Sequence, residues 1–348
     1  MSDQSDEPLN TGYRFTDSSL VRPAITRFWF ARLFPLIPAW LAANILTLLS
    51  TGSLLAVLVL SLDPERWSPS LLAIVFLIAM QVYVAGDHLD GMQAVATGTT
   101  SPLGDFLDHY CDLWAGGILV FGFWTLLGTA GREALFFMHA CLILGFAVTY
   151  AERETRRTLH FTRYGTLEAI VVLTAFFLSW AIPGARSWWQ LPMLAGWPWY
   201  TLVGATGAAM ALSAVAIILR RMGAIPLPVA VFTIGLASLA YLCAIRADIQ
   251  PVEGWLVMAL YGAVYVARVM HGHLVPGTRS WPDRFATIAI VTLATWTIAI
   301  DPAFASLRTA VLVLCAYLSV SAVYALVRII GSLRRYWVWV NASRATAT

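Results

Sequence analysis

The 348-residue chain is 59% hydrophobic and only 12% charged, with a net charge of +3 at neutral pH. Soluble domains are about 45–50% apolar and about 25% charged, so this composition excludes a water-soluble protein. All 22 basic residues are arginines that stand singly or in pairs between apolar stretches. No basic face forms, which argues against a nucleic-acid partner.

The first 34 residues contain no apolar run of the signal-peptide type. Within Ser18 to Phe34, apolar and aromatic residues alternate with Arg22, Arg27 and Arg32. This mixture predicts a helix lying among the lipid headgroups, with a disordered basic tail as the alternative. Residues 1–34 are therefore expected to form a cytoplasmic tail and an interfacial amphipathic helix.

Ten apolar stretches follow, and about 20 residues suffice to cross a ~30 Å hydrocarbon core. They lie at 37–62, 68–94, 104–127, 133–154, 164–182, 200–219, 227–245, 252–267, 285–300 and 307–330. Most of the breaks between them carry turn residues, such as Pro183-Gly184, Pro276-Gly277 and Asp301-Pro302. The expected fold is an all-α polytopic transmembrane bundle with about ten transmembrane helices. We expect a six-helix catalytic core over 35–222 and a four-helix bundle with a cytoplasmic tail over 223–348.

The arginines give an independent indication of topology. With ten spans and the N-terminus inside, 17 of the 22 arginines fall on the inner side. The other five fall outside: Arg66, Arg132, Arg186, Arg246 and Arg308. Basic residues concentrate in cytoplasmic loops, so both termini are expected in the cytoplasm. The arginine- and alanine-rich composition is typical of a GC-rich bacterial genome, so a bacterial inner membrane is the expected location.

Five aspartates gather where the second predicted span ends and the third begins: Asp87, Asp90, Asp105, Asp108 and Asp112. Each ionised carboxylate at membrane depth costs about 2.5–3.5 kcal/mol on insertion scales, so five together require compensation. The i,i+3 and i,i+4 spacings place these acids in stripes on two helices. Hard oxygen ligands suit Mg²⁺ or Mn²⁺, and a phosphate can complete the coordination shell. By the topology above, the cluster faces the cytoplasm, where a soluble nucleotide can reach it.

Asp87-x-x-Asp90-Gly91-x-x-Ala94, nine further residues, and then Gly104-x-x-x-Asp108-x-x-x-Asp112 resembles the motif of the CDP-alcohol phosphotransferases. The sequence between the two halves is similar to that of the eukaryotic-type choline/ethanolamine phosphotransferases. Segments 17–20, 28–29, 44–47 and 158–168 also resemble that branch, so the resemblance covers about residues 13–180.

The resemblance implies an integral membrane enzyme that moves a phosphoalcohol from a CDP-alcohol to a lipid hydroxyl and releases CMP. The implied donor is of the CDP-choline or CDP-ethanolamine type, and the implied acceptor is diacylglycerol or a similar lipid. Two divalent cations, Mg²⁺ or Mn²⁺, would neutralise the diphosphate and stabilise the leaving group. Their implied ligands are Asp87, Asp90, Asp108 and Asp112, the last being a ligand or the base.

The same resemblance assigns five residues to the nucleotide site: Gly91, Ala94, Gly104, Asn44 and Thr47. The three small residues of the motif would allow close approach of the cytidine nucleotide. A base must also take the proton of the acceptor hydroxyl, and His109 and Asp112 are the alternatives for that role. Asp105 lies one helical turn before His109 and could fix its tautomer and orientation.

The chain departs from the family pattern at Val95, where the motif has arginine after the final Ala. Met92 and Ala96 stand where the eukaryotic branch has further basic residues. Arginines after the fourth span could replace the missing charges, or the substrate differs, or the activity is weak. The candidate replacements are Arg153, Arg156, Arg157 and Arg163.

Three other histidines are not assigned to the site. His88 lies inside the acidic motif and is expected to have a structural or surface role. His271 and His273 have no accompanying carboxylate pattern, so they are expected to be loop histidines and not a second metal site.

Two other functions use the same features. A CDP-diacylglycerol-dependent phosphatidyltransferase acting on a small polar alcohol would keep the same site. A catalytically impaired scaffold or transporter of this fold would explain the missing arginine, although unused buried acids would destabilise it. Membrane lipids are the expected surroundings, and a homodimer is a possible assembly.

Overall fold

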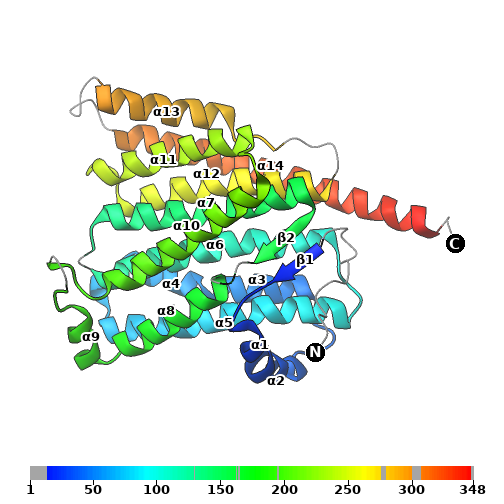
Figure 1. The fold of residues 1–348 in the computed structure, drawn as a ribbon, viewed down its shortest axis with the longest axis horizontal. Coiled ribbons are helices and arrows are strands. Elements are labelled where there is room, and N and C mark those ends of the chain that lie inside the picture. The colour runs from blue at the N-terminus through cyan, green and yellow to red at the C-terminus, as the bar shows by residue number, and fades with distance from the viewer. Residues whose placement is uncertain are drawn as a thin grey trace.

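The computed structural model describes residues 14–128, 130–161, 163, 165–193, 196–275, 280–299 and 307–345. Residues 276–279 and 300–306, which contain two of the expected breaks, lie outside the described residues. Long helices lying side by side dominate the described chain (Figure 1). The expected all-α membrane bundle is therefore confirmed.

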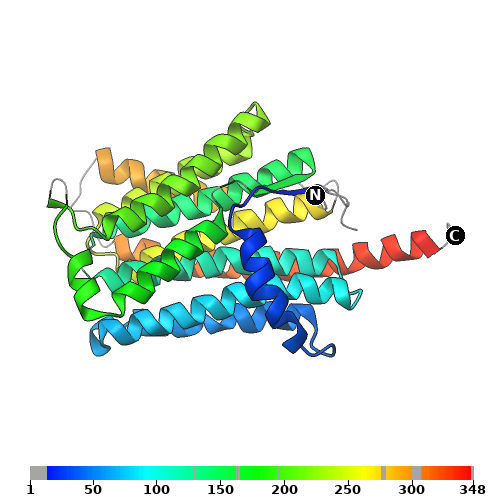
Figure 2. The ribbon, with the colours of Figure 1, turned by 60° about the horizontal axis from the view of Figure 1, so that its bottom comes forward.

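The chain begins with a strand and a short irregular helix. The strand β1 covers Arg14–Asp17, and the helix consists of α1 (Arg22–Ile25), a π-helical stretch (Thr26–Phe30), α2 (Ala31–Leu33) and a 3₁₀ turn (Phe34–Leu36). Figure 2 shows this helix running across the long helices of the bundle. Phe28 and Trp29 are exposed on it, as an amphipathic helix at a membrane surface requires.

The bundle itself contains twelve described helices and one further strand. They are α3 (Ala43–Ser53), α4 (Leu55–Ser61), α5 (Pro69–Ala96), α6 (Pro102–Leu127), α7 (Arg132–Arg156), β2 (Thr158–Phe161), α8 (Thr166–Trp180), α9 (Pro183–Trp189), α10 (Thr201–Met222), α11 (Leu227–Ile245), α12 (Pro251–Leu274), α13 (Arg284–Ala299) and α14 (Leu307–Ala345). A short 3₁₀ turn at Pro64–Arg66 precedes α5.

All ten expected spans coincide with helices, but two of these helices are shorter than a bilayer core. Within the described residues, eight spans are long and apolar enough to cross a membrane, the first being α3 and α4 together. The helix α8 has 15 residues, or about 22 Å at 1.5 Å per residue. It reaches span length only together with α9, from which it is bent by 118° after Trp180. The helix α13 has 16 residues.

A two-stranded sheet was not expected from the sequence. β1 pairs in parallel with β2, with Arg14 opposite Thr158 and Asp17 opposite Phe161. This pairing ties the N-terminal segment to the chain that leaves α7. β1 is thereby held beside the end of the bundle at which α5 turns into α6 (Figure 1).

Close helix packing holds the long helices of the bundle together. A Cβ added to Gly86 of α5 would lie 2.2 Å from Ser50 Cβ of α3, so only glycine permits this approach. α7 packs against α6, α10, α11 and α12. α12 is the most buried of the spanning helices in the described chain. Trp255 on α12 donates its indole N–H to the Gly117 carbonyl of α6 at 2.9 Å.

The expectation that His271 and His273 lie in a loop is wrong. α12 continues to Leu274 and includes both residues. His273 is 1% exposed, and its Nδ1 lies 3.0 Å from the Arg153 carbonyl oxygen. His271 Nε2 lies 3.0 Å from Ser332 Oγ of α14. These polar contacts with neighbouring helices allow α12 to extend through a segment that its hydropathy alone does not favour.

Candidate active site

One cavity of about 700 Å³ contains all five clustered aspartates. Its walls come from the N-terminal segment, α3, α5, α6, α7, β2, α8 and α10. At one end the walls are acidic. The other end, between α6, α7, α8 and α10, is lined by apolar and small residues such as Phe123, Leu142, Leu173 and Gly207.

α5 contributes Asp87 and Asp90 to the acidic end. Asp90 is 4% exposed and accepts a hydrogen bond from the Thr47 hydroxyl of α3. Asp87 Oδ2 lies 3.2 Å from His88 Nδ1. His88 also stacks on Phe30, with ring centroids 4.3 Å apart, and thereby joins α5 to the N-terminal helix.

α6 contributes a compact group of three potential metal ligands. Asp108, His109 and Asp112 each offer a ligand atom, and these atoms all lie within 4.8 Å of one another. Asp108 Oδ1 is buried and has no hydrogen-bond partner among the described residues. A buried carboxylate oxygen without a donor is costly, and a bound cation would satisfy it. Two carboxylates and an imidazole are suitable ligands for a divalent transition ion, and the carboxylates alone suit Mg²⁺.

Tyr83 was not singled out from the sequence. Its hydroxyl donates to Asp112 Oδ1 at 2.6 Å. Tyr83, Asp87 and Asp90 follow at i, i+4 and i+7, which places them on one face of α5. That spacing is the signal by which the tyrosine could have been found.

Asp105 divides its two oxygens between two partners. Its Oδ1 lies 3.3 Å from His109 Nε2, which is the contact that the i,i+4 spacing predicts. Its Oδ2 accepts from Arg153 NH2 at 2.5 Å. Arg153 is 1% exposed on α7, so the arginine neutralises a buried carboxylate and fixes its orientation. His109 Nδ1 faces the other way, 3.4 Å from Asp108 Oδ2.

The five residues assigned to the nucleotide all line the cavity. A Cβ added to Gly91 would meet no atom of the described residues within 4 Å. A Cβ added to Gly104 would lie 3.1 Å from Asn44 Oδ1, so this glycine instead permits α6 to approach α3. Thr47 is buried and its hydroxyl is used by Asp90. Ala94 lies one turn beyond Asp90 on α5.

The four arginines considered as replacements for the missing motif arginine do not line the cavity. Arg153 is paired with Asp105, and Arg157 donates to the His273 carbonyl at 2.6 Å. Arg156 and Arg163 are exposed. Val95 itself is 67% exposed and lies on the cavity wall. Among the described residues, one arginine lines the cavity, and it is Arg22.

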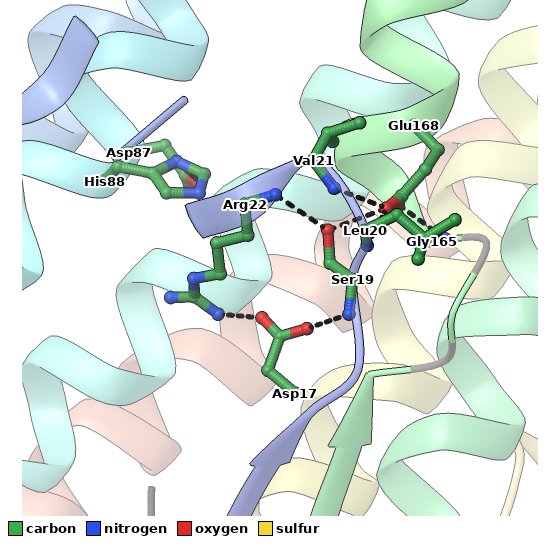
Figure 3. A network of polar contacts seen from close by, with 9 residues as sticks. All are labelled: Asp17, Ser19, Leu20, Val21, Arg22, Asp87, His88, Gly165 and Glu168. Atoms are coloured by element: carbon green, nitrogen blue, oxygen red, sulfur yellow. Dashed lines mark hydrogen bonds and ion pairs between the residues drawn. The ribbon is translucent and has the colours of Figure 1, made fainter. Parts of the chain in front are cut away.

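Glu168 of α8 binds the N-terminal segment at the wall of the cavity (Figure 3). Glu168 Oε1 accepts from the Ser19 hydroxyl at 2.7 Å and from the Leu20 N–H at 2.8 Å. Its Oε2 accepts from the Gly165 N–H at 2.9 Å. Asp17 Oδ1 accepts from the Ser19 N–H at 2.7 Å, and Asp17 Oδ2 pairs with the Arg22 guanidinium.

Comparison with known proteins agrees with this geometry. Residues 40–196 match the CDP-alcohol phosphatidyltransferase family. This stretch of the chain is therefore similar to a CDP-alcohol phosphatidyltransferase domain. The matched residues include α3 to α8 and every clustered aspartate, and they lie inside the catalytic core expected from the sequence.

Three relatives illustrate the branch. A class-I family protein of Schizosaccharomyces pombe is 30% identical over 207 residues, which is 55% of this chain and 53% of the relative. Cholinephosphotransferase 1 of Rattus norvegicus is 30% identical over 193 residues, covering 52% and 47%. Choline/ethanolaminephosphotransferase 1 of Arabidopsis thaliana is 28% identical over 183 residues, covering 50% and 45%. The chain thus spans about half the length of the curated relatives that it matches.

The resemblance to the eukaryotic-type branch is confirmed, whereas the expected bacterial inner membrane receives no support because these relatives are eukaryotic.

Proposed function

We propose that the protein transfers a phosphoalcohol from a CDP-alcohol to a lipid hydroxyl and releases CMP. The observation that carries this proposal is the single cavity that joins an acidic end to an apolar end. A nucleotide diphosphate needs cations and polar groups, whereas acyl chains need an apolar space. Both requirements are met within one continuous volume.

The donor that fits best is CDP-choline or CDP-ethanolamine. The matched rat and Arabidopsis proteins are named for choline and for choline/ethanolamine phosphotransfer. The acceptor that fits best is diacylglycerol. Leu119, Phe123 and Leu142 line the apolar part of the cavity, and Gly204 and Gly207 on α10 keep it open because they carry no side chain.

Asp87, Asp90, Asp108 and Asp112 are the proposed ligands of two divalent cations, Mg²⁺ or Mn²⁺. When bound, such ions polarise phosphoryl oxygens and stabilise a leaving phosphate. In the described part of the chain, Asp108 Oδ1 has no hydrogen-bond partner. Thr47 and Tyr83 orient the carboxylates of Asp90 and Asp112 through hydrogen bonds. Thr47 is therefore proposed to position a ligand and not to bind the nucleotide directly.

His109 is the proposed base, with Asp112 as the alternative. Asp105 holds one ring nitrogen of His109, and Arg153 holds Asp105. The imidazole removes the proton of the acceptor hydroxyl while the hydroxyl oxygen attacks the phosphorus that carries the alcohol. The bond from that phosphorus to the CMP oxygen breaks, CMP leaves, and the lipid retains the phosphoalcohol. General-base catalysis of this kind contributes about 10²–10⁴-fold.

The acidic end of the cavity is proposed to face the cytoplasm. The last turns of α14 project beyond the end of the bundle that holds the α5–α6 turn (Figure 1). Arg334 and Arg335 belong to this part of α14, and arginines concentrate on the cytoplasmic side. The arginine distribution and the position of the site then both place the acidic end on the cytoplasmic side. A soluble CDP-alcohol would enter the cavity from that side.

The test uses purified protein with Mg²⁺ or Mn²⁺ and separate donors. The proposal requires CMP release and a choline or ethanolamine phospholipid when diacylglycerol is supplied. CMP release only from CDP-diacylglycerol with a small alcohol would instead identify a phosphatidyltransferase. Binding without any turnover would identify a scaffold or transporter of the same fold.

A further inference from the structure

The cavity has far more negative than positive wall groups. Seven described carboxylates line it: Asp17, Asp87, Asp90, Asp105, Asp108, Asp112 and Glu168. Arg153 compensates Asp105 from outside, and two divalent ions would compensate the four proposed ligands. The diphosphate of a CDP-alcohol then adds further negative charge. A cation on the wall is needed to hold it.

Position 95 does not supply that cation, because it is valine. The arginines of the loop after α7 do not supply it either, since none of them lines the cavity. Arg221 at the end of α10 is bound in a two-pronged ion pair with Glu152, at 2.9 and 2.8 Å. Among the described residues, only Arg22 offers a guanidinium on the cavity wall.

Arg22 is held in place by its own segment. Its backbone N–H donates to Ser19 Oγ at 3.1 Å, and Ser19 Oγ in turn donates to Glu168. Its NH1 pairs with Asp17, which also accepts from the Ser19 N–H (Figure 3). The side chain remains 37% exposed. The guanidinium is thus anchored yet accessible to a ligand that enters the cavity.

We infer that Arg22 binds the diphosphate of the CDP-alcohol and replaces, from the N-terminal segment, the arginine that the motif lacks after Ala94. A guanidinium has five N–H donors in a planar fork, so it can contact a phosphate and Asp17 at once. Arginine pairs with phosphate through two parallel hydrogen bonds. The inference rests on the proposed function, because it takes a CDP-alcohol as the ligand.

The test compares equilibrium binding of CDP-choline, with Mg²⁺ present, to the wild type and to three variants in the full-length protein. Arg22→Gln is expected to weaken affinity about tenfold or more, the scale of a hydrogen bond to a charged group. Arg22→Lys is expected to retain part of the affinity because it keeps the charge. Arg27→Gln is the matched control, because Arg27 is exposed on the same helix outside the cavity.

Asp17→Asn separates ligand binding from a purely structural role. The asparagine Oδ1 can still accept from the Ser19 N–H, but the ion pair with Arg22 is lost. If Arg22 binds phosphate, Asp17→Asn leaves affinity unchanged or raises it, because a nearby negative charge disappears. If the ion pair merely holds the segment in place, Asp17→Asn and Arg22→Gln weaken binding equally, and the inference is wrong.

A double variant that combines Arg22→Gln with Val95→Arg tests whether an arginine at position 95 restores CDP-choline binding. We expect it to restore at least part of the affinity, since position 95 faces the same cavity. An Arg22→Gln variant that binds CDP-choline as tightly as the wild type would overturn the inference but leave the proposed function intact. A wild type that binds no cytidine diphosphate compound would overturn both.

Discussion

Asp105 has one partner that its spacing predicts and one that it does not. The i,i+4 relation to His109 predicts an orienting carboxylate, and the contact is present at 3.3 Å. The same carboxylate also meets the buried Arg153. Asp105 therefore serves two neighbours, one catalytic in our proposal and one structural.

The double role makes a prediction about stability. Asp105→Asn removes the charge that compensates Arg153, which is 1% exposed. Removing one partner of a buried ion pair typically costs about 3–5 kcal/mol. We expect a clearly lower unfolding midpoint in thermal denaturation of the purified protein. Asp63→Asn, an exposed loop change, is the control. An unchanged midpoint for Asp105→Asn would mean that this ion pair contributes nothing to the fold.

His109 gives the second prediction at this scale. His109→Gln should lower the rate of transfer by about 10²–10⁴-fold while CDP-choline binding survives. Single-turnover CMP release measures the rate, and equilibrium binding supplies the comparison. If His109→Gln is nearly silent while Asp112→Asn is inactive with metal still bound, the base is Asp112.

At the scale of elements, one side chain of α8 holds the N-terminal segment in position. Glu168 accepts hydrogen bonds from Ser19, Leu20 and Gly165, and β1 adds the pairing with β2. This segment carries Arg22 and lines the cavity with Asp17, Ser19 and Arg22. The docking of the N-terminal segment therefore determines where Arg22 lies in the cavity wall.

Glu168→Gln should loosen that docking without disturbing the bundle. A neutral amide is a weaker acceptor than a carboxylate, whose charged hydrogen bonds contribute roughly 1.5–3 kcal/mol each. Hydrogen exchange at Leu20 should therefore accelerate at least about tenfold, with α12 unaffected. Glu65→Gln, in an exposed turn, should change nothing. Unchanged exchange at Leu20 would show that Glu168 does not hold the segment.

The elements could be predicted from the sequence in so far as hydropathy defines them. Ten apolar stretches coincide with helices because each carries a mostly apolar run, and most of these runs end near a proline or a glycine. The pairing of β1 with β2 could not be predicted, because four residues reading RFTD resemble any polar tail. The partners of the acids could not be predicted either. Thr47, Tyr83 and Arg153 reach them from other helices or other turns, and only the packed fold decides those contacts.

At the scale of the whole molecule, the cavity connects the acidic site to a space among α6, α7, α8 and α10. α10 makes this space through its small residues. Gly207 lines it, and in the described part of the chain no atom lies within 4 Å of a Cβ added there. A large side chain at Gly207 can therefore enter the space without a steric clash at its first atom.

Gly207→Phe should impair use of the lipid and not of the nucleotide. Filling the apolar end is expected to raise KM for long-chain diacylglycerol by about tenfold, a cost of about 1.4 kcal/mol, with CDP-choline affinity unchanged. Dioctanoylglycerol should be affected less than dioleoylglycerol. Ala205→Phe, on the same helix but outside the cavity lining, is the matched control. Equal effects of the two variants on both lipids would place the acceptor elsewhere.

We propose that one acidic cluster, with bound cations, transfers a phosphoalcohol from a cytidine nucleotide to a lipid. The most direct measurement is CMP release by purified protein given CDP-choline or CDP-ethanolamine, diacylglycerol and Mg²⁺ or Mn²⁺, with the lipid product identified by mass spectrometry. We predict stoichiometric CMP and phospholipid for the wild type, loss of both on chelation, and loss of both in Asp108→Asn at normal expression and unfolding temperature. Full activity of Asp108→Asn, or no CMP from the wild type with either donor, would contradict the account.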